Sequence, residues 1–453
     1  MVLLNVGDTY TGVLNAPLQE RETIRIACAA HPSGYQFMPR FKQGIWDGWI
    51  SLYKYGKFPS GLLGRVCVAL DEKSIAYDID GVGLNDGCTE FDSSKVKDSL
   101  VGITLRDYQL QAVERCILLQ RGILRMATNS GKTAVAAAII QATGSKAVIV
   151  VPSRALLLQT ADKLEAMLGI SVGRIGAGYM QDESVTVTTM ASLEKLAHKD
   201  LRDNRVIILD EAHHASAAQI FDNIFDIPGR YRIGMSGTPL KHDLLSDLKL
   251  IGATGEVIYE VSNSELIENG YSVRPIIKMH TVADSDTYYK ADYQDAYRTA
   301  IVENDFRNEL IAKIACEELM RGPVLILVNW IEHARAIEDF LPTATVATGQ
   351  DSKDEIQNKL SRLATKEIPI LIATEIFGEG IDIPAISTVI MAAGGKSHIR
   401  LLQRVGRGLR VAAGKDRLVV HDFIDDTNKN LLRHSEMRHR LYKAEGFEVK
   451  LVN

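Results

Sequence analysis

From Leu105 onward the chain alternates short apolar segments with longer stretches of helical periodicity. The apolar segments fall in two series, at 122–127, 147–151, 185–189, 206–209 and 232–235, and at 324–328, 368–373, 388–392 and 418–422. Strands that are buried on both faces and separated by helices are typical of parallel sheets in α/β domains. The pattern therefore predicts two such domains in tandem, joined between residues 255 and 275.

The first hundred residues follow a different pattern, without helical periodicity. They predict short strands broken by Gly, Pro, Asn and Asp, for example at 23–29 and 61–70. The expected organisation is a small N-terminal β-rich (α+β) module over residues 1–95, a first α/β domain over 96–260 and a second over 261–453, which ends in a basic helical tail. The predicted fold class is therefore α/β.

Composition narrows the class of protein. A chain of 453 residues with 46% apolar and 24% charged content is long enough for two or three folded domains. No window approaches the ~18 apolar residues of a membrane span, and no signal-like stretch opens the chain, which predicts a cytoplasmic protein. The five cysteines are scattered singly, so we expect packing residues rather than a zinc site or disulfides. The net charge is −5, yet residues 396–453 hold 13 Lys and Arg against 7 Asp and Glu.

The segment ATNSGKT at 127–133 follows an apolar strand and opens an Ala-rich helix. Such a turn directs backbone N–H groups and a helix N-terminus at one place, which suits a triphosphate. Met126 stands where the strict phosphate-loop pattern has its first Gly, whereas Asn129 replaces a Gly but tolerates a left-handed backbone. Lys132 would reach the β and γ phosphates, and Thr133 would place its hydroxyl on Mg²⁺. The expected ATP contacts are Thr128, Asn129, Ser130, Gly131, Lys132 and Thr133. The alternative is a chance Gly-Lys-Thr at a helix start.

A second motif, DEAHH at 210–214, follows the apolar segment VIILD. This position places Asp210 and Glu211 at the carboxyl end of a strand, where open parallel sheets bind ligands. Asp210 would bind Mg²⁺, and Glu211 would orient and deprotonate the attacking water. Two acids after a strand could instead cap a helix without any catalytic role.

A third motif, QRVGRGLR at 403–410, spaces three arginines at intervals of three residues, along one face of a helix. If the second domain docks on the first, Arg407 and Arg410 neutralise charge on the γ-phosphoryl group, with Gln403 at the start of the segment and Arg404 a less certain member. The alternative is a solvated or nucleic-acid-binding stripe.

In this order the segments resemble those of superfamily 2 helicases and translocases, over residues 104–425. LRDYQ at 105–109 is similar to the adenine-recognition segment, which implies that Gln109 reads adenine with Arg106 beside it. SGTP at 236–239 resembles the segment that couples hydrolysis to movement. TEIFGEGIDIP at 374–384 matches a segment of the second domain, where Gly380 and Asp382 are expected at the nucleotide. The resemblance implies two RecA-like domains that bind ATP and Mg²⁺ between them.

The same resemblance assigns two further segments, VPSRALLLQ at 151–159 and VTTMASL at 187–193, to contact with a nucleic-acid strand. Backbone amides and hydroxyls would hold phosphates, which makes the contacts independent of sequence. The candidates are Ser153, Arg154, Thr189 and Ser192 in the first domain and Asn329, Thr374 and Gly378 in the second. The tail could add nonspecific attraction through Arg433, Arg438, Arg440 and Lys443, or could equally be a solvated helix.

The N-terminal module is similar to that of phage branch-migration helicases, through MPRFKQGIWDGWISLY at 38–53 and FPSGL at 58–62. Eight aromatic residues fall between 35 and 58, together with four basic residues and one acid. Aromatic residues among cations can stack on bases, although most of these favour the core of a small module. We expect Arg40, Lys42 and Lys57 to contact DNA phosphates, rather than the tryptophans to stack.

The sequence therefore predicts an ATP-hydrolysing DNA helicase or translocase that acts as a monomer on forked or four-way DNA in phage recombination, replication and repair. An RNA helicase would share every ATP-site residue. A restriction-type motor subunit is a second alternative, although the chain has no nuclease-like acidic cluster. A third is an ATP-gated binding protein without turnover, against which the water-activating acid and the arginines argue.

Overall fold

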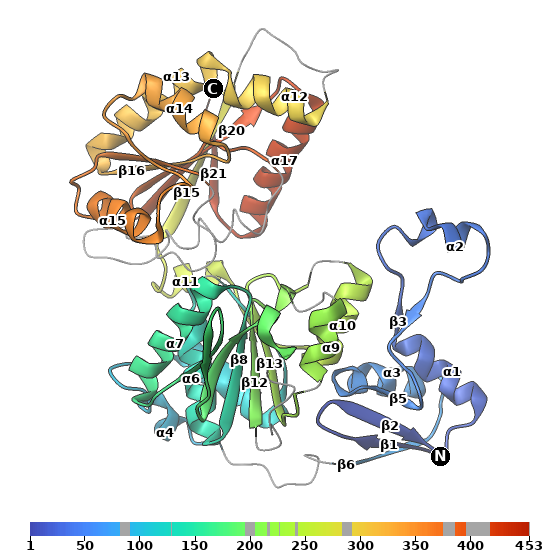
Figure 1. The fold of residues 1–453 in the computed structure, drawn as a ribbon. Coiled ribbons are helices and arrows are strands. Elements are labelled where there is room, and N and C mark those ends of the chain that lie inside the picture. The colour runs from blue at the N-terminus through green and yellow to red at the C-terminus, as the bar shows by residue number, and fades with distance from the viewer. Residues whose placement is uncertain are drawn as a thin grey trace. The chain divides into compact units, whose positions relative to one another are not determined.

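The computed structural model describes residues 1–81, 91–127, 129–194, 204–214, 218–225, 227–240, 243–282, 292–374, 386–395 and 417–452 (Figure 1). They form two compact units. Unit 1 comprises Met1–Ala127 and Gly131–Val261, and unit 2 comprises Ser262–Asn453 together with the short segment Thr128–Ser130. Among the described residues, no helix is long and apolar enough to cross a membrane.

Unit 1 is built on an eight-stranded sheet with the order β10-β9-β11-β8-β12-β13-β7-β14. Its strands are β7 (Arg121–Met126), β8 (Lys146–Val151), β9 (Gly173–Gly176), β10 (Tyr179–Gln181), β11 (Val185–Thr189), β12 (Asn204–Asp210), β13 (Tyr231–Ser236) and β14 (Val257–Val261). All pairs are parallel except β9 with β10. The helical elements are α5 (Asp107–Leu119), α6 (Lys132–Thr143), α7 (Arg154–Leu168), η3 (Met190–Ser192), η4 (Ala212–His214), α9 (Ala218–Phe225) and α10 (Leu244–Thr254). The five strands predicted for this region are confirmed, whereas β9, β10 and β14 were missed.

The N-terminal part of unit 1 has its own sheet, of order β5-β2-β1-β6. The elements of this part are β1 (Val2–Val6), β2 (Tyr10–Leu14), α1 (Leu18–Ala27), β3 (Ala29–Ala30), η1 (Tyr35–Phe37), α2 (Pro39–Lys42), β4 (Ile50–Ser51), β5 (Lys57–Pro59), η2 (Ser60–Leu62), α3 (Leu63–Glu72) and β6 (Tyr77–Gly81). Helix α4 (Ser93–Lys97) packs instead against α5 and α6, beside the large sheet. The strands predicted at 23–29 and 61–70 are wrong, because α1 and α3 occupy most of these positions. The β-branched residues there suggested strands, but Ile24 with Ala27 and Val66 with Leu70 bury one helical face.

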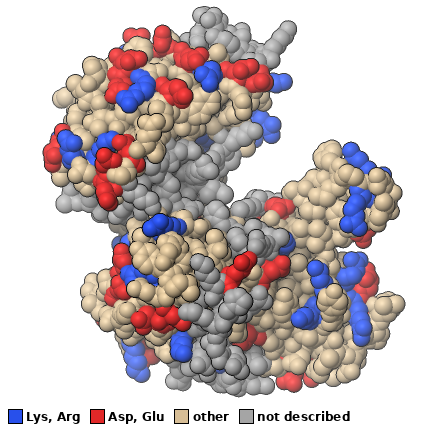
Figure 2. Space-filling model, in the orientation of Figure 1, with Lys and Arg blue, Asp and Glu red and all other residues tan. Residues whose placement is uncertain are grey.

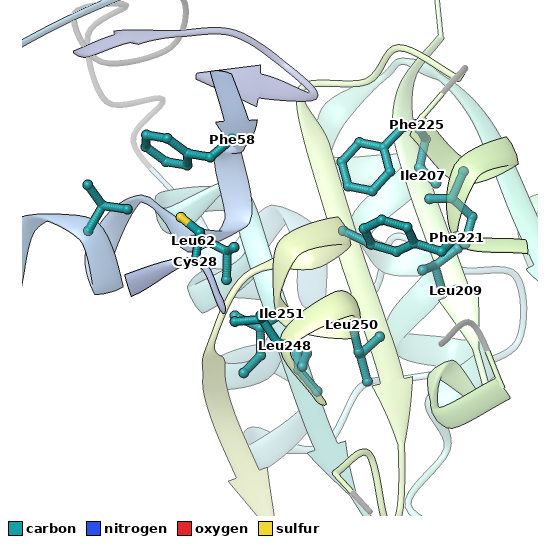
Figure 3. Close-up of a cluster of buried hydrophobic side chains, with 14 of the residues drawn as sticks. Cys28, Phe58, Leu62, Ile207, Leu209, Phe221, Phe225, Leu248, Leu250 and Ile251 are labelled. Atoms are coloured by element: carbon teal, nitrogen blue, oxygen red, sulfur yellow. The ribbon is translucent and has the colours of Figure 1, made fainter. Parts of the chain in front are cut away.

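The N-terminal sheet and the large sheet of unit 1 share one apolar core (Figure 3). Phe58 and Leu62 on the N-terminal side and Phe221, Phe225 and Ile251 on the other belong to this cluster. Helix α10 provides much of the contact, because η2 packs directly against its last turn. The N-terminal module is therefore supported by the helix that follows the SGTP segment.

Unit 2 is built on a seven-stranded sheet with the order β17-β18-β16-β19-β20-β15-β21, in which every pair is parallel. Its strands are β15 (Arg274–Val282), β16 (Val324–Leu327), β17 (Thr345–Ala347), β18 (Ile370–Ala373), β19 (Thr388–Met391), β20 (Arg417–Asp425) and β21 (Glu448–Val452). The helical elements are α11 (Asn263–Glu268), α12 (Tyr293–Tyr297), η5 (Arg298–Val302), α13 (Asp305–Glu318), η6 (Leu319–Arg321), α14 (Ile331–Phe340), α15 (Lys353–Ala364) and α17 (Lys429–Ala444). Two parallel-sheet units in tandem confirm the predicted α/β fold class.

Candidate nucleotide site

The turn between β7 and α6 has the backbone that the phosphate-binding prediction requires. Asn129 has φ of 74° and Gly131 has φ of 80°, so both lie in the left-handed region. Gly131 is the N-cap of α6 and has no side chain to cap the first turn, whose amides are thus placed to bind an anion. A Cβ at Gly131 would lie 2.4 Å from Nε2 of Gln109, and the positive φ of Gly131 favours glycine here. The prediction that Asn129 would accept a left-handed backbone is confirmed.

The acids of DEAHH lie at the carboxyl end of β12, beside this turn. Lys132 Nζ lies 3.4 Å from Glu211 Oε1, and both side chains are 16% exposed. Oδ1 of Asp210 accepts a 3.0 Å hydrogen bond from the backbone N–H of Glu211. Glu211 itself has φ of 47°, a strained value for a residue with a side chain. The structure thus brings together the cation and the carboxylates that the sequence predicted for one site.

These residues fit Mg²⁺ with a triphosphate. Mg²⁺ prefers oxygen ligands and usually takes one or two from the protein and the rest from phosphates and water. The hydroxyl of Thr133, in the first turn of α6, and the carboxylate of Asp210 are donors of this kind. Among the described residues no group of three or more His, Cys, Asp or Glu side chains is arranged to hold a metal ion. The chemistry of the site therefore suits a metal that arrives with a nucleotide better than one held by the protein alone.

A buried histidine links the acids to the SGTP segment. His213 Nδ1 lies 3.5 Å from Glu211 Oε2 and 3.0 Å from Ser236 Oγ. Ser236 Oγ in turn accepts a 3.2 Å hydrogen bond from the backbone N–H of Thr238. The sequence analysis gave no role to His213, although its position three residues after Asp210 in the motif was a usable signal. The chain of contacts runs from Lys132 to the turn that precedes α10.

Gln109 and Arg106 lie at the start of α5. Gln109 is buried, its Oε1 accepts a 2.9 Å hydrogen bond from the Arg106 backbone N–H, and its Nε2 faces the Gly131 turn. Arg106 is exposed and donates from Nη1 to the hydroxyl of Tyr108 at 3.3 Å. Gln109 therefore lies against the phosphate-binding turn, and its reading of adenine stays a prediction.

The side chains of unit 1 that are predicted to contact a nucleic-acid strand differ in how far they are exposed. Ser153 is the N-cap of α7 and its Oγ accepts a 3.4 Å hydrogen bond from the Leu156 backbone N–H, while Arg154 is exposed. Thr189 and Ser192 are buried, and the Thr189 hydroxyl donates to Ser192 Oγ at 2.9 Å. Arg154 is thus accessible, and its contact with a phosphate stays a prediction, whereas Thr189 and Ser192 hold their own turn.

In unit 2, Asn329 Nδ2 donates to the Tyr297 hydroxyl at 3.1 Å, and Tyr297 donates to the Ala393 carbonyl at 2.5 Å. Burial raises the pKa of Tyr297, so this hydroxyl stays protonated and able to donate. Thr374 is buried. The remaining candidates lie outside the described residues: Thr128, Gly378, Gly380, Asp382, Gln403, Arg404, Arg407 and Arg410.

The basic residues that are predicted to contact DNA outside the ATP site fall into an exposed group and a buried one. Arg40 and Lys42 are exposed on α2, and Lys57 is exposed with its Nζ 4.5 Å from the centre of the Tyr10 ring. Arg438, in contrast, is buried and paired with Asp422 at 2.9 Å, so it does not contribute to surface attraction.

Comparison with known proteins shows two helicase domains in this chain. Residues 102–241 match the family described as type III restriction enzyme, res subunit, and residues 307–412 match the helicase conserved C-terminal domain. The chain is 27% identical over 470 residues to the ATP-dependent DNA helicase uvsW of Enterobacteria phage T4, covering 93% of both chains. It is 25% identical over 368 residues to a candidate helicase of Sulfolobus islandicus filamentous virus, covering 72% of this chain and 65% of that one.

A solved structure supports the fold over nearly the whole chain. A fragment of a candidate HsdR subunit of a type I restriction enzyme from Vibrio vulnificus YJ016 superposes with a TM-score of 0.60. It covers 98% of this chain and 84% of that fragment, at 19% identity. The likeness extends to the N-terminal module as well as to the two parallel-sheet units.

Proposed function

The chain belongs to the superfamily 2 helicases and is an ATP hydrolase, and on that premise we propose that it is a DNA helicase or translocase that remodels forked and four-way DNA. The observation that carries the proposal is the contact chain Lys132–Glu211–His213–Ser236, because it joins the phosphate-binding turn to the segment that precedes α10. A protein that only bound ATP would not need a carboxylate held in this position.

Different residues of unit 1 have different roles in ATP hydrolysis. The amides of the α6 N-terminus bind the phosphates, and Lys132 neutralises the β and γ oxygens. Mg²⁺, when bound through Thr133 and Asp210, stabilises charge on the phosphate oxygens. A γ-phosphate that takes over the Lys132 cation releases the Glu211 carboxylate to accept a proton from the attacking water. Arg407 and Arg410 are the predicted arginines of this step.

The support for DNA comes from the length of the match to the phage helicase. That match spans 93% of both chains and so includes the N-terminal module, where Arg40 and Lys42 are exposed. Unit 1 would grip a strand through the α7 N-terminus and Arg154, and steps would follow as ATP binding and release change the fit between the two units. Action as a monomer in the cytoplasm, the host cytoplasm if phage-encoded, stays a prediction.

A restriction-type motor is the second candidate, because the family matched by residues 102–241 is the res subunit of type III restriction enzymes. The two functions differ in substrate. A branch-remodelling enzyme responds most strongly to a junction, whereas a motor subunit translocates on intact duplex without preference for a branch.

The test is ATP hydrolysis by the purified protein without nucleic acid and with single-stranded DNA, linear duplex, a four-way DNA junction and structured RNA. Glu211→Gln is the control, and it is expected to lower turnover by at least about 100-fold while ATP binding persists. Greatest stimulation by the junction supports the proposal. Equal stimulation by linear duplex would favour the restriction-type motor, and stimulation by RNA alone would replace both.

A further inference from the structure

The residues between β3 and β4, here named the 31–49 lobe, form a small projection that exposes several large apolar side chains. The lobe carries η1 and α2 and extends beyond the short pairing of β3 with β4 (Figure 1). Phe37 is 71% exposed and Ile45 is 65% exposed, and Met38 is also exposed. Exposed apolar side chains grouped on a small lobe of a folded protein indicate a contact surface.

The aromatic residues of the lobe separate into a scaffold and an exposed group. His31 stacks on Tyr35 at 3.9 Å and contacts Trp49 at 3.9 Å, while Tyr35 meets the edge of Phe41 at 4.9 Å. His31 Nδ1 also lies 2.7 Å from the Gly48 carbonyl. His31, Tyr35 and Phe41 are only partly exposed and stiffen the lobe, while Trp49 is 39% exposed at its edge.

Phe37 belongs to the exposed group, and cations accompany it. Lys42 Nζ lies 5.9 Å from the centre of the Phe37 ring, and Arg40 is exposed on the same short helix. Figure 2 shows blue Lys and Arg side chains beside uncharged surface on this lobe. Residues 31–49 hold two basic residues, Arg40 and Lys42, against one acid, Asp47. A flat apolar ring flanked by cations is complementary to a base with its phosphates, whereas the neutral surface of a protein partner needs no such cations.

The base of the lobe is fixed to unit 1 at two points. Ser33 Oγ donates to Asp243 Oδ1 at 2.7 Å, at the residue that precedes α10. Ser51 Oγ donates to the Arg25 carbonyl at 3.0 Å, at the end of α1. A stiff lobe with a fixed base can exert force on what its tip touches.

We propose that the tip of the 31–49 lobe is a wedge that stacks Phe37 on the base exposed at a DNA branch point. Paired bases inside a duplex are covered by their neighbours, so a projecting apolar side chain reaches a base face only where stacking is interrupted. Phe, Ile and Met are side chains that proteins insert between base steps. Arg40 and Lys42 would hold the flanking phosphates. This inference rests on the proposed function, because it names the part of the branched substrate that the N-terminal module recognises.

The experiment uses the full chain and a forked DNA with 2-aminopurine at the branch nucleotide, whose fluorescence reports a change in stacking. Phe37→Ala is compared with the wild type and with Phe306→Ala, which removes a 52% exposed phenylalanine from α13 of unit 2. Fork opening by Phe37→Ala is expected to be about tenfold slower, a loss larger than any loss of ATPase activity stimulated by single-stranded DNA. Phe306→Ala should match the wild type.

Two further variants separate stacking from a structural effect. Phe37→Trp keeps a flat ring and should restore both the 2-aminopurine signal and fork opening. Ile45→Ala should slow fork opening as well, and both alanine variants should keep the wild-type melting temperature because the side chains are exposed. Equal fork opening and equal fluorescence for Phe37→Ala and Phe306→Ala would overturn the wedge and leave the apolar tip to a protein partner. If the wild-type protein opens no branched DNA at all, the proposed function itself is wrong. This outcome is seen in the wild type, before any variant is compared with it.

Discussion

Both units bury arginine side chains, and Arg232 of unit 1 and Arg438 of unit 2 are held in opposite ways. Arg232 of β13 donates to the main-chain carbonyls of Ile224, Ile227 and Ala253, at 2.8–3.0 Å. Arg438 of α17 makes a bidentate ion pair with Asp422 of β20. Burial disfavours the charge of both guanidinium groups. At Arg438 the carboxylate outweighs burial and the pKa is raised, whereas the pKa of Arg232 is lowered.

The difference follows from what each arginine joins. The carbonyls around Arg232 lie at or just after the C-terminal ends of α9 and α10, where the helix dipole favours a cation. Arg232 thereby ties the strand that ends in Ser236 to the two helices that support the N-terminal module. Arg438 fixes α17 to the central part of its own sheet. The first arrangement has no ion pair within the described part of the chain and can tolerate small shifts of the helices, while the second fixes one geometry.

Arg438→Met is expected to have the largest effect on stability. It leaves the Asp422 carboxylate buried without its cation, which should lower the free energy of unfolding of unit 2 by about 3–5 kcal/mol. Denaturant unfolding followed by circular dichroism measures the loss. Arg440→Met, in the same helix but exposed, is the matched control and should change stability by less than about 0.5 kcal/mol. Equal losses in the two variants would contradict the account of the ion pair.

Arg232→Met should cost less, about 2–3 kcal/mol, although Arg232 is just as deeply buried. The substitution removes three hydrogen bonds to main-chain carbonyls but also removes a buried charge that makes no ion pair among the described residues, and the two effects partly offset. Unfolding of Arg232→Met and Arg438→Met under identical conditions gives the ranking. If Arg232→Met lost more free energy of unfolding than Arg438→Met, the expected ranking of the two arginines would be reversed.

A pair of histidines in unit 2 adds a dependence on pH. His280 Nε2 lies 2.8 Å from His421 Nδ1, and the other side of His421 faces Glu318 at 3.3 Å. Burial, followed by the charges of His421 and Lys278, lowers the pKa of His280 to about 4 from 6.5. The neutral form is thus favoured in the fold, so this stability is complete above pH 6.5 and is lost as the pH falls toward 4.

The loss from His280 should reach about 2 kcal/mol at pH 5. Because other groups also titrate, the informative quantity is the difference in unfolding free energy between pH 7 and pH 5 for the wild type and for His280→Gln. The variant is expected to lose about 2 kcal/mol less over this interval. The same pH dependence in both proteins would show that folding does not shift the pKa of His280.

The sequence predicted the parallel sheets and the position of the ATP site because both depend on local patterns. An apolar segment that runs directly into ATNSGKT or DEAHH fixes where a strand ends and which turn comes after it. The different surroundings of Arg232 and Arg438 could not be predicted from local patterns in the same way. Arg438 belongs to a basic tail that resembles a solvated helix, and only the fold shows that it faces Asp422.

Contacts that depend on the register between strands also escaped the sequence analysis. His213 meets Ser236 because β12 and β13 pair with Asp210 opposite Met235. Neither the DEAHH motif nor the SGTP motif predicts how β12 and β13 pair. The N-terminal helices were missed for another reason, since β-branched residues favour strands in isolation and only packing against the shared core determines their helical state.

Gly61→Ala is the smallest expected effect and tests how the N-terminal module is held in unit 1. An added Cβ at Gly61 would lie 2.0 Å from the Ile251 carbonyl oxygen, a main-chain atom at the end of α10 that cannot rotate away. The expected loss in free energy of unfolding is about 1–2 kcal/mol. Gly64→Ala, in the first turn of α3 with open space around its Cβ, is the matched control and should be neutral or slightly stabilising. Because α10 also receives Arg232, a double variant with Arg232→Met should lose less than the sum of the two single losses. Strict additivity would mean that β13 and the N-terminal module contact α10 independently, and that Arg232 does not connect them.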